Sequence, residues 1–544
     1  MILKQIFKSI SRREWQFIAF FSLLLIIITS IPLIYGYLKT PADKIFTGMH
    51  FVSADDWFVY YSFINQGKEG LLLFNDLFSS IDHLPVVRPL WLGVGLLARF
   101  FNLSAFLSFN LARVILIPIF IIVSYLLISL FFEDKLKRKL VLSFLAFSSG
   151  LGIFLIYRLA LYPSNYANGC FHWPMDLWVP DINSFFTLFA SPHFIAASIL
   201  IFLIFLFTIL FSQEYNYYYP LLSGLSGLFL FSFHPFQVLK VYIIIAVFFL
   251  ILFIKAKKII WHYVFYGLIF LFISLPSVFY YLWLMKVDWL TIQRALQNIN
   301  PTTPLLTTII SFGGLFVGFI LGINYLYKNN LLKNYKYLFL IIWAIVQFVL
   351  LYAPVNYQRR LALGIHLPFV LLTCIFLFHF YQVKKELIKK YAVAFSVLIF
   401  IVFIPSNLFV LATDIMIYNQ EREASYLDLD TYQGFIWLKE NSDAESIIFS
   451  SVRTGNILPA YALRTSYVGH AVETPYYNQR KKEPAWFFSQ KKDVGLEFFK
   501  KRNIKYIFYG KLEKELGNFD PNSQSYLKEV YTSKEVKIFE VLPR

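Results

Sequence analysis

Long apolar stretches, separated by short polar ones, dominate the pattern of hydrophobic and polar positions along this chain. Most are as long as the roughly 20 residues that an α-helix needs to cross a bilayer. Continuous apolar runs of this length do not suit barrel strands, so the pattern predicts an α-helical polytopic membrane protein with about eleven transmembrane helices. The stretches, of which the fifth is short, are 17–38, 114–132, 140–160, 192–212, 219–233, 236–254, 260–282, 304–327, 337–353, 361–381 and 391–412.

The composition agrees with this class of protein. Of the 544 residues, 58% are hydrophobic and 15% are charged, whereas soluble domains are about half apolar and about a quarter charged. The two cysteines, Cys170 and Cys374, form no Cys-x-x-Cys motif. The sequence therefore indicates neither a zinc site nor a disulfide framework.

Basic residues indicate which way the chain crosses the membrane. When the eleven stretches are threaded in order, 18 lysines and arginines of the N-terminal segment and four loops fall on one side. Cytoplasmic loops are enriched in these residues, so we expect the N-terminus in the cytoplasm and the C-terminus outside. The formal net charge of +17 then follows largely from topology, and no nucleic-acid partner is expected.

Composition also divides the chain into two predicted domains. Residues 1–412 hold the apolar stretches, and their first outer loop, 39–113, is long enough to carry helices at the membrane interface. Residues 413–544 are less apolar and mix helical and strand patterns, such as "VGLEFFKKRN" followed by "IKYIFYG". We expect them to form a small extracytoplasmic α/β domain.

Two adjacent carboxylates, Asp55 and Asp56, lie near the start of a helical pattern in the first outer loop that ends at Gly67 or Gly70. Acids in a first turn can simply serve the helix dipole, but carboxylates near hydrocarbon are costly and often functional. Neighbouring side chains on a helix point about 100° apart, so these two do not flank a bond as a glycosidase pair does. They favour a single general base, or a ligand of a divalent cation such as Mg²⁺ or Mn²⁺.

Arginine is concentrated on the predicted outer side. Only three of the 18 cytoplasmic basic residues are arginines. Guanidinium groups bind phosphate and carboxylate in a two-pronged manner, so the outer arginines favour an anion site, with snorkelling or pairing to loop acids as the structural alternative. The outer arginines up to residue 360 are Arg88, Arg99, Arg113, Arg158, Arg294, Arg359 and Arg360. A carboxylate and an anion site on one face suit sugar transfer from a lipid phosphate, because a leaving phosphate needs positive charge and no proton.

Several short motifs occur in an order that is more specific than any one of them. The segment "DWFVYYSFINQGKEG" contains Asp56, Tyr60, Gln66 and Gly70 at the spacing of a bacterial subgroup of membrane glycosyltransferases. Later motifs are "NLARV" with Arg113, "SPHF" with His193, "FHPF" with His234, "RRLALGIHLP" with Arg359 and Arg360, and "GHAVETP" with His470. The chain thereby resembles, over nearly its whole length, the GT-C superfamily of integral-membrane glycosyltransferases.

This resemblance implies a reaction. A sugar would pass from a polyprenyl-phosphate donor to a hydroxyl group of a glycan, lipid or protein acceptor, with Asp56 favoured over Asp55 as the base. Arg113, Arg359 and Arg360 would bind the donor phosphate.

The resemblance also implies accessory groups and a location. His193 and His234 would join the phosphate site, although a histidine at a membrane boundary is more often structural. Where the subgroup often has Glu-Pro-His, this chain has Ile81, Asp82 and His83, so a second acidic role would pass to Asp82. The other site candidates are Tyr60, Gln66, His83 and His470. Some members use a divalent cation. We expect a multi-pass protein of the plasma or inner membrane, in contact with its lipids, whose active site and C-terminal domain are extracytoplasmic.

Two other functions remain open at this stage. A transporter or flippase of lipid-linked sugar would have ionisable residues at mid-membrane and internal repeats of broken helices, whereas charges here lie mostly at the ends of the apolar stretches. A GT-C-like protein that binds lipid-linked sugar without catalysis is the second alternative.

Overall fold

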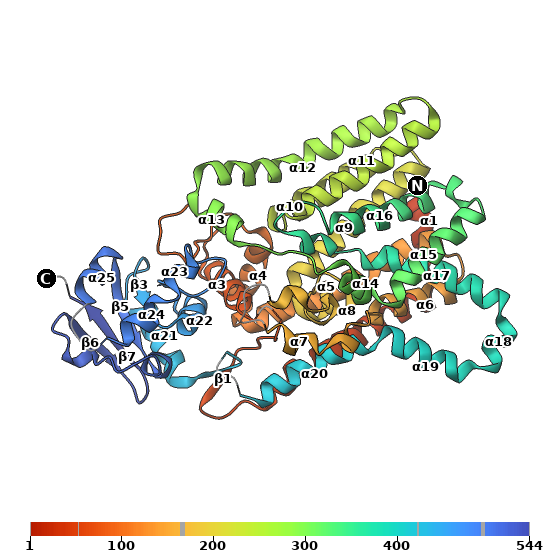
Figure 1. The fold of residues 1–544 in the computed structure, drawn as a ribbon. Coiled ribbons are helices and arrows are strands. Elements are labelled where there is room, and N and C mark those ends of the chain that lie inside the picture. Colours follow the sequence, from red (N-terminus) through yellow and green to blue (C-terminus); the bar gives the residue numbers. More distant parts are fainter. Residues whose placement is uncertain (1, 53, 164–168, 422–423, 491–494, 543–544) are drawn as a thin grey trace. The chain divides into compact units, whose positions relative to one another are not determined.

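The computed structural model describes residues 2–52, 54–163, 169–421, 424–490 and 495–542 (Figure 1). The chain forms two compact units, each built from segments that are far apart in the sequence. The helical unit comprises Met1–Pro32, Ala112–Leu282 and Asn300–Thr413. The sheet unit comprises Leu33–Leu111, Trp283–Ile299 and Asp414–Arg544. The predicted α/β segment 413–544 thus shares a unit with most of the first outer loop, and the predicted division at residue 412 stays a prediction.

Apolar helices dominate the chain. Among the described residues, seven helical segments are long and apolar enough to cross a membrane: α2 (Arg12–Leu38), α5 (Ala105–Phe131), Lys135–Leu155 with α6 (Lys135–Phe147), α9 (Pro192–Gln213), α11 (Gln237–Ala256), α12 (Trp261–Val287) and α17 (His366–Val383). Two bent pairs raise the number to nine: α14 (Leu305–Phe312) with α15 (Gly314–Lys328), and α19 (Ala392–Phe403) with α20 (Pro405–Asn419). The polytopic helical fold is confirmed.

The predicted number of about eleven differs from nine for a physical reason. The two other apolar stretches form α10 (Tyr218–Phe233) and α16 (Tyr335–Leu350), each of 16 residues. A helix of this length is about 24 Å long, which is short of the roughly 30 Å hydrocarbon core. Hydropathy finds these helices but does not fix where their ends lie. The shorter helices of the unit are α1 (Ile2–Ser9), α7 (Arg158–Leu161), α8 (Ser184–Ala190) and α18 (Lys385–Lys390).

The bend between α14 and α15 is located by a glycine. The two helices meet at 84°, and Gly313 between them has a φ of 55°. A side chain there would also place its Cβ 2.8 Å from Cγ of Leu151. Glycine therefore meets both the conformational and the steric requirement of the break.

The helices of the unit differ in how much of their surface is covered by protein. In the most apolar window of α9, 89% of residues are buried, against 22% in that of α12. The centre of the unit is therefore built around α9, and α12 presents most of its apolar surface outwards.

The sheet unit contains a five-stranded mixed sheet in the order β4-β3-β5-β7-β6, of which β3, β5, β6 and β7 are labelled in Figure 1. Strands β3 (Ile447–Phe449), β4 (Thr465–Ser466) and β5 (Ile504–Tyr509) are parallel. Strand β7 (Lys537–Val541) pairs antiparallel with β5 and forms a hairpin with β6 (Leu527–Thr532). An aromatic-rich core that includes Phe449, Phe487 and Phe499 packs on the sheet. The helices after residue 413 are α21 (Leu429–Asn441), α22 (Val452–Ala462), α23 (Tyr477–Arg480), α24 (Glu483–Phe488), α25 (Gly495–Lys501) and α26 (Lys511–Lys514). The small α/β arrangement expected near the C-terminus is confirmed.

The first outer loop is tied to the C-terminal segment by a second, two-stranded sheet. In it, β1 (Lys44–Phe46) pairs antiparallel with β2 (Tyr426–Asp428). The predicted loop helix is α3 (Asp56–Glu69), which ends at Gly70 in the left-handed conformation with φ 99°. It packs on α4 (Pro89–Phe100) where Gly67 and Gly95 approach each other. A third segment contributes α13 (Trp289–Gln297).

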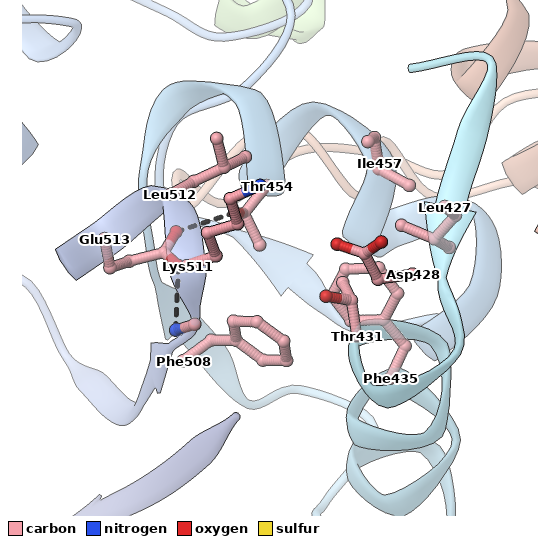
Figure 2. A pocket seen from close by; sticks show the side chains of 11 residues that line it. Leu427, Asp428, Thr431, Phe435, Thr454, Ile457, Phe508, Lys511, Leu512 and Glu513 are labelled. Atoms are coloured by element: carbon pink, nitrogen blue, oxygen red, sulfur yellow. Dashed lines mark hydrogen bonds between the residues drawn. The ribbon is translucent and has the colours of Figure 1, made fainter. Parts of the chain in front are cut away.

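A pocket of the sheet unit is lined by residues of α21, α22 and α26 and by Phe508 of β5 (Figure 2). Glu513 extends into this region, and its carboxylate accepts hydrogen bonds from the amide N–H groups of Ser451 (2.7 Å) and Gly510 (2.9 Å) and from Oγ1 of Thr454 (2.6 Å). The Glu513 carboxylate therefore caps the start of α22. The polar groups on this side of the pocket have a structural role.

Candidate active site

Asp56 and His470 form a hydrogen-bonded pair in the sheet unit. Asp56 is the first residue of α3, and its Oδ1 lies 2.9 Å from Nε2 of His470. The side chain of Asp56 is 28% exposed and that of His470 is 5% exposed, so the carboxylate stays accessible while its partner is enclosed. Burial lowers the pKa of His470, but the bond to Asp56 and the carboxylates of Asp56, Glu473 and Asp55 outweigh burial and raise this pKa. Two residues from distant motifs are thus in contact.

Asp55 has different surroundings from its neighbour. It occupies the N-cap position of α3, its side chain makes no capping hydrogen bond, and it is exposed. Its backbone carbonyl accepts a bond from Nδ2 of Asn456 in α22 at 3.3 Å. The contact to His470 therefore distinguishes Asp56 from Asp55.

Two acids, the buried Asp76 and the partly buried Glu473, share one arginine close to this site. Nε of Arg294 lies 2.5 Å from Oε2 of Glu473 and 3.6 Å from Oδ2 of Asp76. Burial raises the pKa of Asp76 to about 6, with Arg294 opposing it. Arg294 and Arg88 outweigh burial at Glu473 and lower its pKa. Sequence reasoning missed both acids, although Glu473 lies in "GHAVETP", three residues after His470.

Two further candidates, Tyr60 and Gln66, lie on α3, and both side chains contact other residues of the sheet unit. The ring of Tyr60 stacks on Trp91 at 4.6 Å between centroids and 18° between planes. The side chain of Gln66 is buried and bonds to both the amide N–H (2.8 Å) and the carbonyl oxygen (3.0 Å) of Asn75. Gln66 therefore fixes the turn after the helix.

Asp82 and His83 lie in the loop between α3 and α4. Asp82 is exposed, and His83 bonds to backbone groups of its own loop, with Nε2 accepting from the amide N–H of Asp76 at 2.9 Å. The buried acid of this loop is Asp76, six residues earlier. The second acidic role assigned to Asp82 stays a prediction.

Positive charge gathers in the helical unit around the 3₁₀ turn η5 (Gln358–Ala362). Nη1 of Arg360 lies 3.6 Å from Oδ2 of Asp181, which is fully buried. The guanidinium group of Arg359 lies over the ring of Trp178 at 4.3 Å and near that of Phe171 at 5.8 Å. Burial raises the pKa of Asp181 in spite of the nearby cations.

Lys240 of α11 adds a third cation to this cluster. Its ammonium group donates to the carbonyl oxygen of Leu363 at 2.5 Å, and its electrostatic partner is Asp181. Arg359, Arg360 and Lys240 thus surround one carboxylate, which leaves an excess of positive charge suited to an anion. Sequence reasoning missed Asp181 and Lys240, although Lys240 is an ionisable residue inside the apolar stretch 236–254, which is itself a signal of function.

His193 and His234 lie close together in the same unit, with ring centroids 6.0 Å apart. Nδ1 of His193 is 2.7 Å from Oγ of Ser191. Burial, His193, Arg360 and Lys240 together hold the pKa of His234 well below its ordinary value. His234 is therefore neutral, and it can offer a hydrogen bond to an anion without adding charge.

Arg113 is buried in α5 and is engaged with neighbouring helices. Its guanidinium group donates to Oγ1 of Thr29 at 2.7 Å and to Oγ of Ser30 at 2.8 Å. Binding a phosphate would require these bonds to be exchanged, so its predicted role is less favoured than those of Arg359 and Arg360.

The described residues contain no group of three or more His, Cys, Asp or Glu side chains able to hold a metal ion. Asp55 and Asp56, the predicted cation ligands, do not form such a group with His470. Mg²⁺ usually keeps several waters and needs only one or two carboxylates together with phosphate oxygens of a substrate, so the role of Asp55 and Asp56 as cation ligands stays a prediction.

Comparison with protein-family models gives no match, and neither does a search of curated proteins. Solved structures of similar fold include the Archaeoglobus fulgidus oligosaccharyltransferase tethered to an acceptor peptide containing the NVT sequon (TM-score 0.53, 14% identity) and its apo form (0.52, 16%). A third is the same organism's oligosaccharyltransferase AglB in complex with an inhibitory peptide and a dolichol-phosphate (0.50, 14%). Each match covers 90% of this chain and 69% of the other. The likeness confirms the fold that the sequence motifs imply.

Proposed function

We propose that this membrane protein, which has the fold of the GT-C superfamily of integral-membrane glycosyltransferases, transfers a sugar from a polyprenyl-phosphate donor to an acceptor hydroxyl group. The observation that carries the proposal is the accessible Asp56 carboxylate at the start of α3, held by His470. Asp56 is the general base.

The reaction follows from this assignment. Asp56 accepts the proton of the acceptor hydroxyl group, and the hydroxyl oxygen forms a bond to the anomeric carbon. The bond between that carbon and the phosphate oxygen breaks, and the electron pair leaves with polyprenyl phosphate. Attack from the face opposite the leaving group inverts the anomeric configuration. The leaving phosphate requires no proton, and positive charge stabilises it.

Arg359 and Arg360 are the residues that we assign to the donor phosphate. Their support is the excess positive charge around η5, where Arg359, Arg360 and Lys240 surround the carboxylate of Asp181. His234, which is neutral, and His193 would donate hydrogen bonds. Arg113 is a weaker member of this set because of its bonds to α2 residues.

The partners follow from the same chemistry. The donor is lipid-linked, and the acceptor is a glycan, a lipid or a protein. One protein of similar fold is in complex with a dolichol-phosphate, and another of its structures holds an acceptor peptide, which supports a lipid-linked donor in general terms. We assign acceptor recognition to the segment after residue 413. No step is assigned to Mg²⁺ or Mn²⁺, and the requirement is tested by adding EDTA and then restoring each ion.

The experiment uses membrane vesicles containing the full chain and a panel of tritiated polyprenyl-phosphate hexoses and pentoses. Label should leave the lipid and appear in the acceptor fraction. General base catalysis contributes about 10²–10⁴-fold, so Asp56→Asn should lower turnover by at least about 100-fold. Asp55→Asn, the matched neighbour, should lose far less. Full turnover in Asp56→Asn would remove Asp56 from the role.

The site is assigned to the outer face of the plasma or inner membrane. A chain with Cys170 and Cys374 replaced by serine and with Asp82→Cys should react with an impermeant maleimide added outside intact cells. Asp82 is exposed and belongs to the same loop as Asp56. Labelling from the cytoplasmic side alone would contradict the assignment.

A transporter of lipid-linked sugar is the second candidate, favoured by the 84° break between α14 and α15. Broken helices line substrate sites in many transporters. The same assay separates the three functions, because a transporter moves labelled donor across the vesicle without forming product, and a binding protein does neither.

A further inference from the structure

The two ring nitrogens of His470 have partners of opposite character. Nδ1 lies 3.3 Å from the amide nitrogen of Val472 and 3.2 Å from that of Glu473. Amide N–H groups only donate, so Nδ1 is the acceptor. In the neutral ring the proton is therefore on Nε2, which donates to Oδ1 of Asp56 at 2.9 Å. The backbone of the His470 loop selects the tautomer.

The His470 loop, residues 469–474, is held from two other segments of the sheet unit. Nε2 of Gln297 in α13 donates to the carbonyl oxygens of Val472 and Thr474, both at 3.0 Å. Oγ1 of Thr474 donates to the carbonyl oxygen of Phe78 at 3.0 Å. Arg294 pairs with Glu473 of the same loop. The imidazole is thus positioned by contacts on both sides of its loop.

We propose that His470 is a positioning residue for Asp56: its Nε2–H binds one carboxylate oxygen and so orients the carboxylate that accepts the substrate proton. This inference rests on the proposed function. It assigns to the segment after residue 413 a direct part in the catalytic machinery, beyond acceptor recognition.

The same geometry argues against a proton relay through the ring. A relay would bring a proton onto Nδ1, where it would point at the amide N–H groups of Val472 and Glu473. The carboxylates of Asp56, Glu473 and Asp55 favour a charged imidazole, whereas the two amide N–H groups at Nδ1 oppose a proton there. The two amide donors act directly on Nδ1, so we expect the neutral donor to be the working form.

Two substitutions separate positioning from a purely structural role. The amide nitrogen of His470→Gln reaches about as far as Nε2 and can donate to Asp56, but it leaves the loop amides without the Nδ1 acceptor. The side-chain oxygen of His470→Asn can replace Nδ1 as the acceptor for those amides, but this side chain is too short to reach Asp56.

We expect His470→Gln to keep kcat within about 10-fold of the wild type, and His470→Asn to lose about 100-fold, the scale of a misplacement of about 1 Å. The donor KM should change by less than about threefold in both variants, because the group affected is the base. The temperature of thermal unfolding should be lower for the Gln variant than for the Asn variant. Activity and stability therefore rank the two variants in opposite orders.

A structural role predicts the same order for both properties, with the Asn variant more active, and this result would overturn the proposal. Equal and large losses of kcat in two folded variants would overturn it as well. Asp56→Asn is measured in parallel on the same tritiated donors. If that variant keeps full turnover, the proposed function fails. If it is inactive while His470→Asn is fully active, the proposed function stands and the inference alone is wrong.

Discussion

The contact between α3 and α4 gives a prediction whose size can be worked from distances. A Cβ atom at Gly95 would lie 2.7 Å from Cα of Gly67 and 2.9 Å from the carbonyl oxygen of Ile64. Carbon atoms in ordinary contact are about 3.5–4.0 Å apart, so Gly95→Ala requires the two helix backbones to separate by about 1 Å. No flexible side chain is there to yield, because all of the close atoms belong to the backbone.

Gly93 provides a matched control two residues away on the same helix. A Cβ atom there meets nothing within 4 Å, and the residue is exposed. Alanine is favoured over glycine in a helix by about 1 kcal/mol, and this gain is common to both substitutions. Overpacking at a close contact costs about 1–3 kcal/mol. The difference in the free energy of unfolding between the two variants is therefore about 1–3 kcal/mol, with Gly95→Ala the less stable.

The contact also affects activity, because α3 carries Asp56 eleven residues before Gly67, about 16 Å along the helix. A tilt of α3 moves the carboxylate relative to His470 without changing any polar group. We expect turnover to fall by about 10-fold or more in Gly95→Ala and to stay at the wild-type level in Gly93→Ala. The measurements are thermal unfolding in detergent, followed by tryptophan fluorescence, and transfer from the tritiated donor. Equal unfolding temperatures and equal turnover in the two variants would refute the steric reasoning.

Other predictions concern the buried charges. Burial raises the pKa of Asp76 from its ordinary 3.8 to about 6. The stabilisation from its protonated form is therefore complete below about pH 4 and is lost as the pH rises through about 6. Between pH 4 and pH 7, the unfolding temperature of Asp76→Asn should fall less than that of the wild type. Arg360→Lys keeps the charge beside Asp181 but loses the two-pronged geometry, so donor KM should rise by about 10-fold with little change in unfolding temperature, and an unchanged KM would remove Arg360 from the phosphate site. Arg360→Ala leaves Asp181 without its nearest cation and should cost about 3–5 kcal/mol, which would appear as a lower unfolding temperature at neutral pH.

The hydrophobic pattern was sufficient to predict where the helices lie, but it was insufficient to predict where they end. Each of the eleven apolar stretches contains helix, because runs of apolar residues have no other stable arrangement in a bilayer. The 84° bend after Phe312 was not predicted, since mean hydropathy does not change at a single glycine. The end of α3 was expected at Gly67 or Gly70, because glycine after the last turn is a local signal, and Gly70 is the cap.

The candidate site likewise has a part that could be predicted from the sequence and a part that could not. Asp56, Arg359 and Arg360 could be proposed from residue type and predicted side of the membrane. The contact of Asp56 with His470 could not, because these residues are separated by 414 positions and a single sequence contains no information on their pairing. Asp76 was missed for a similar reason: its importance comes from burial beside Glu473, which is a property of the folded chain.

The pairing of β1 with β2 also has a consequence for biosynthesis. Lys44 pairs with Asp428, and at the usual rate of about 5–20 residues per second the ribosome needs roughly 20–80 seconds to reach the second strand after the first. During this interval Asp56 has been made but His470 has not. A nascent or prematurely terminated chain would thus sit in the membrane with its carboxylate unsupported, and the ability to modify acceptors would arise only when translation is nearly finished.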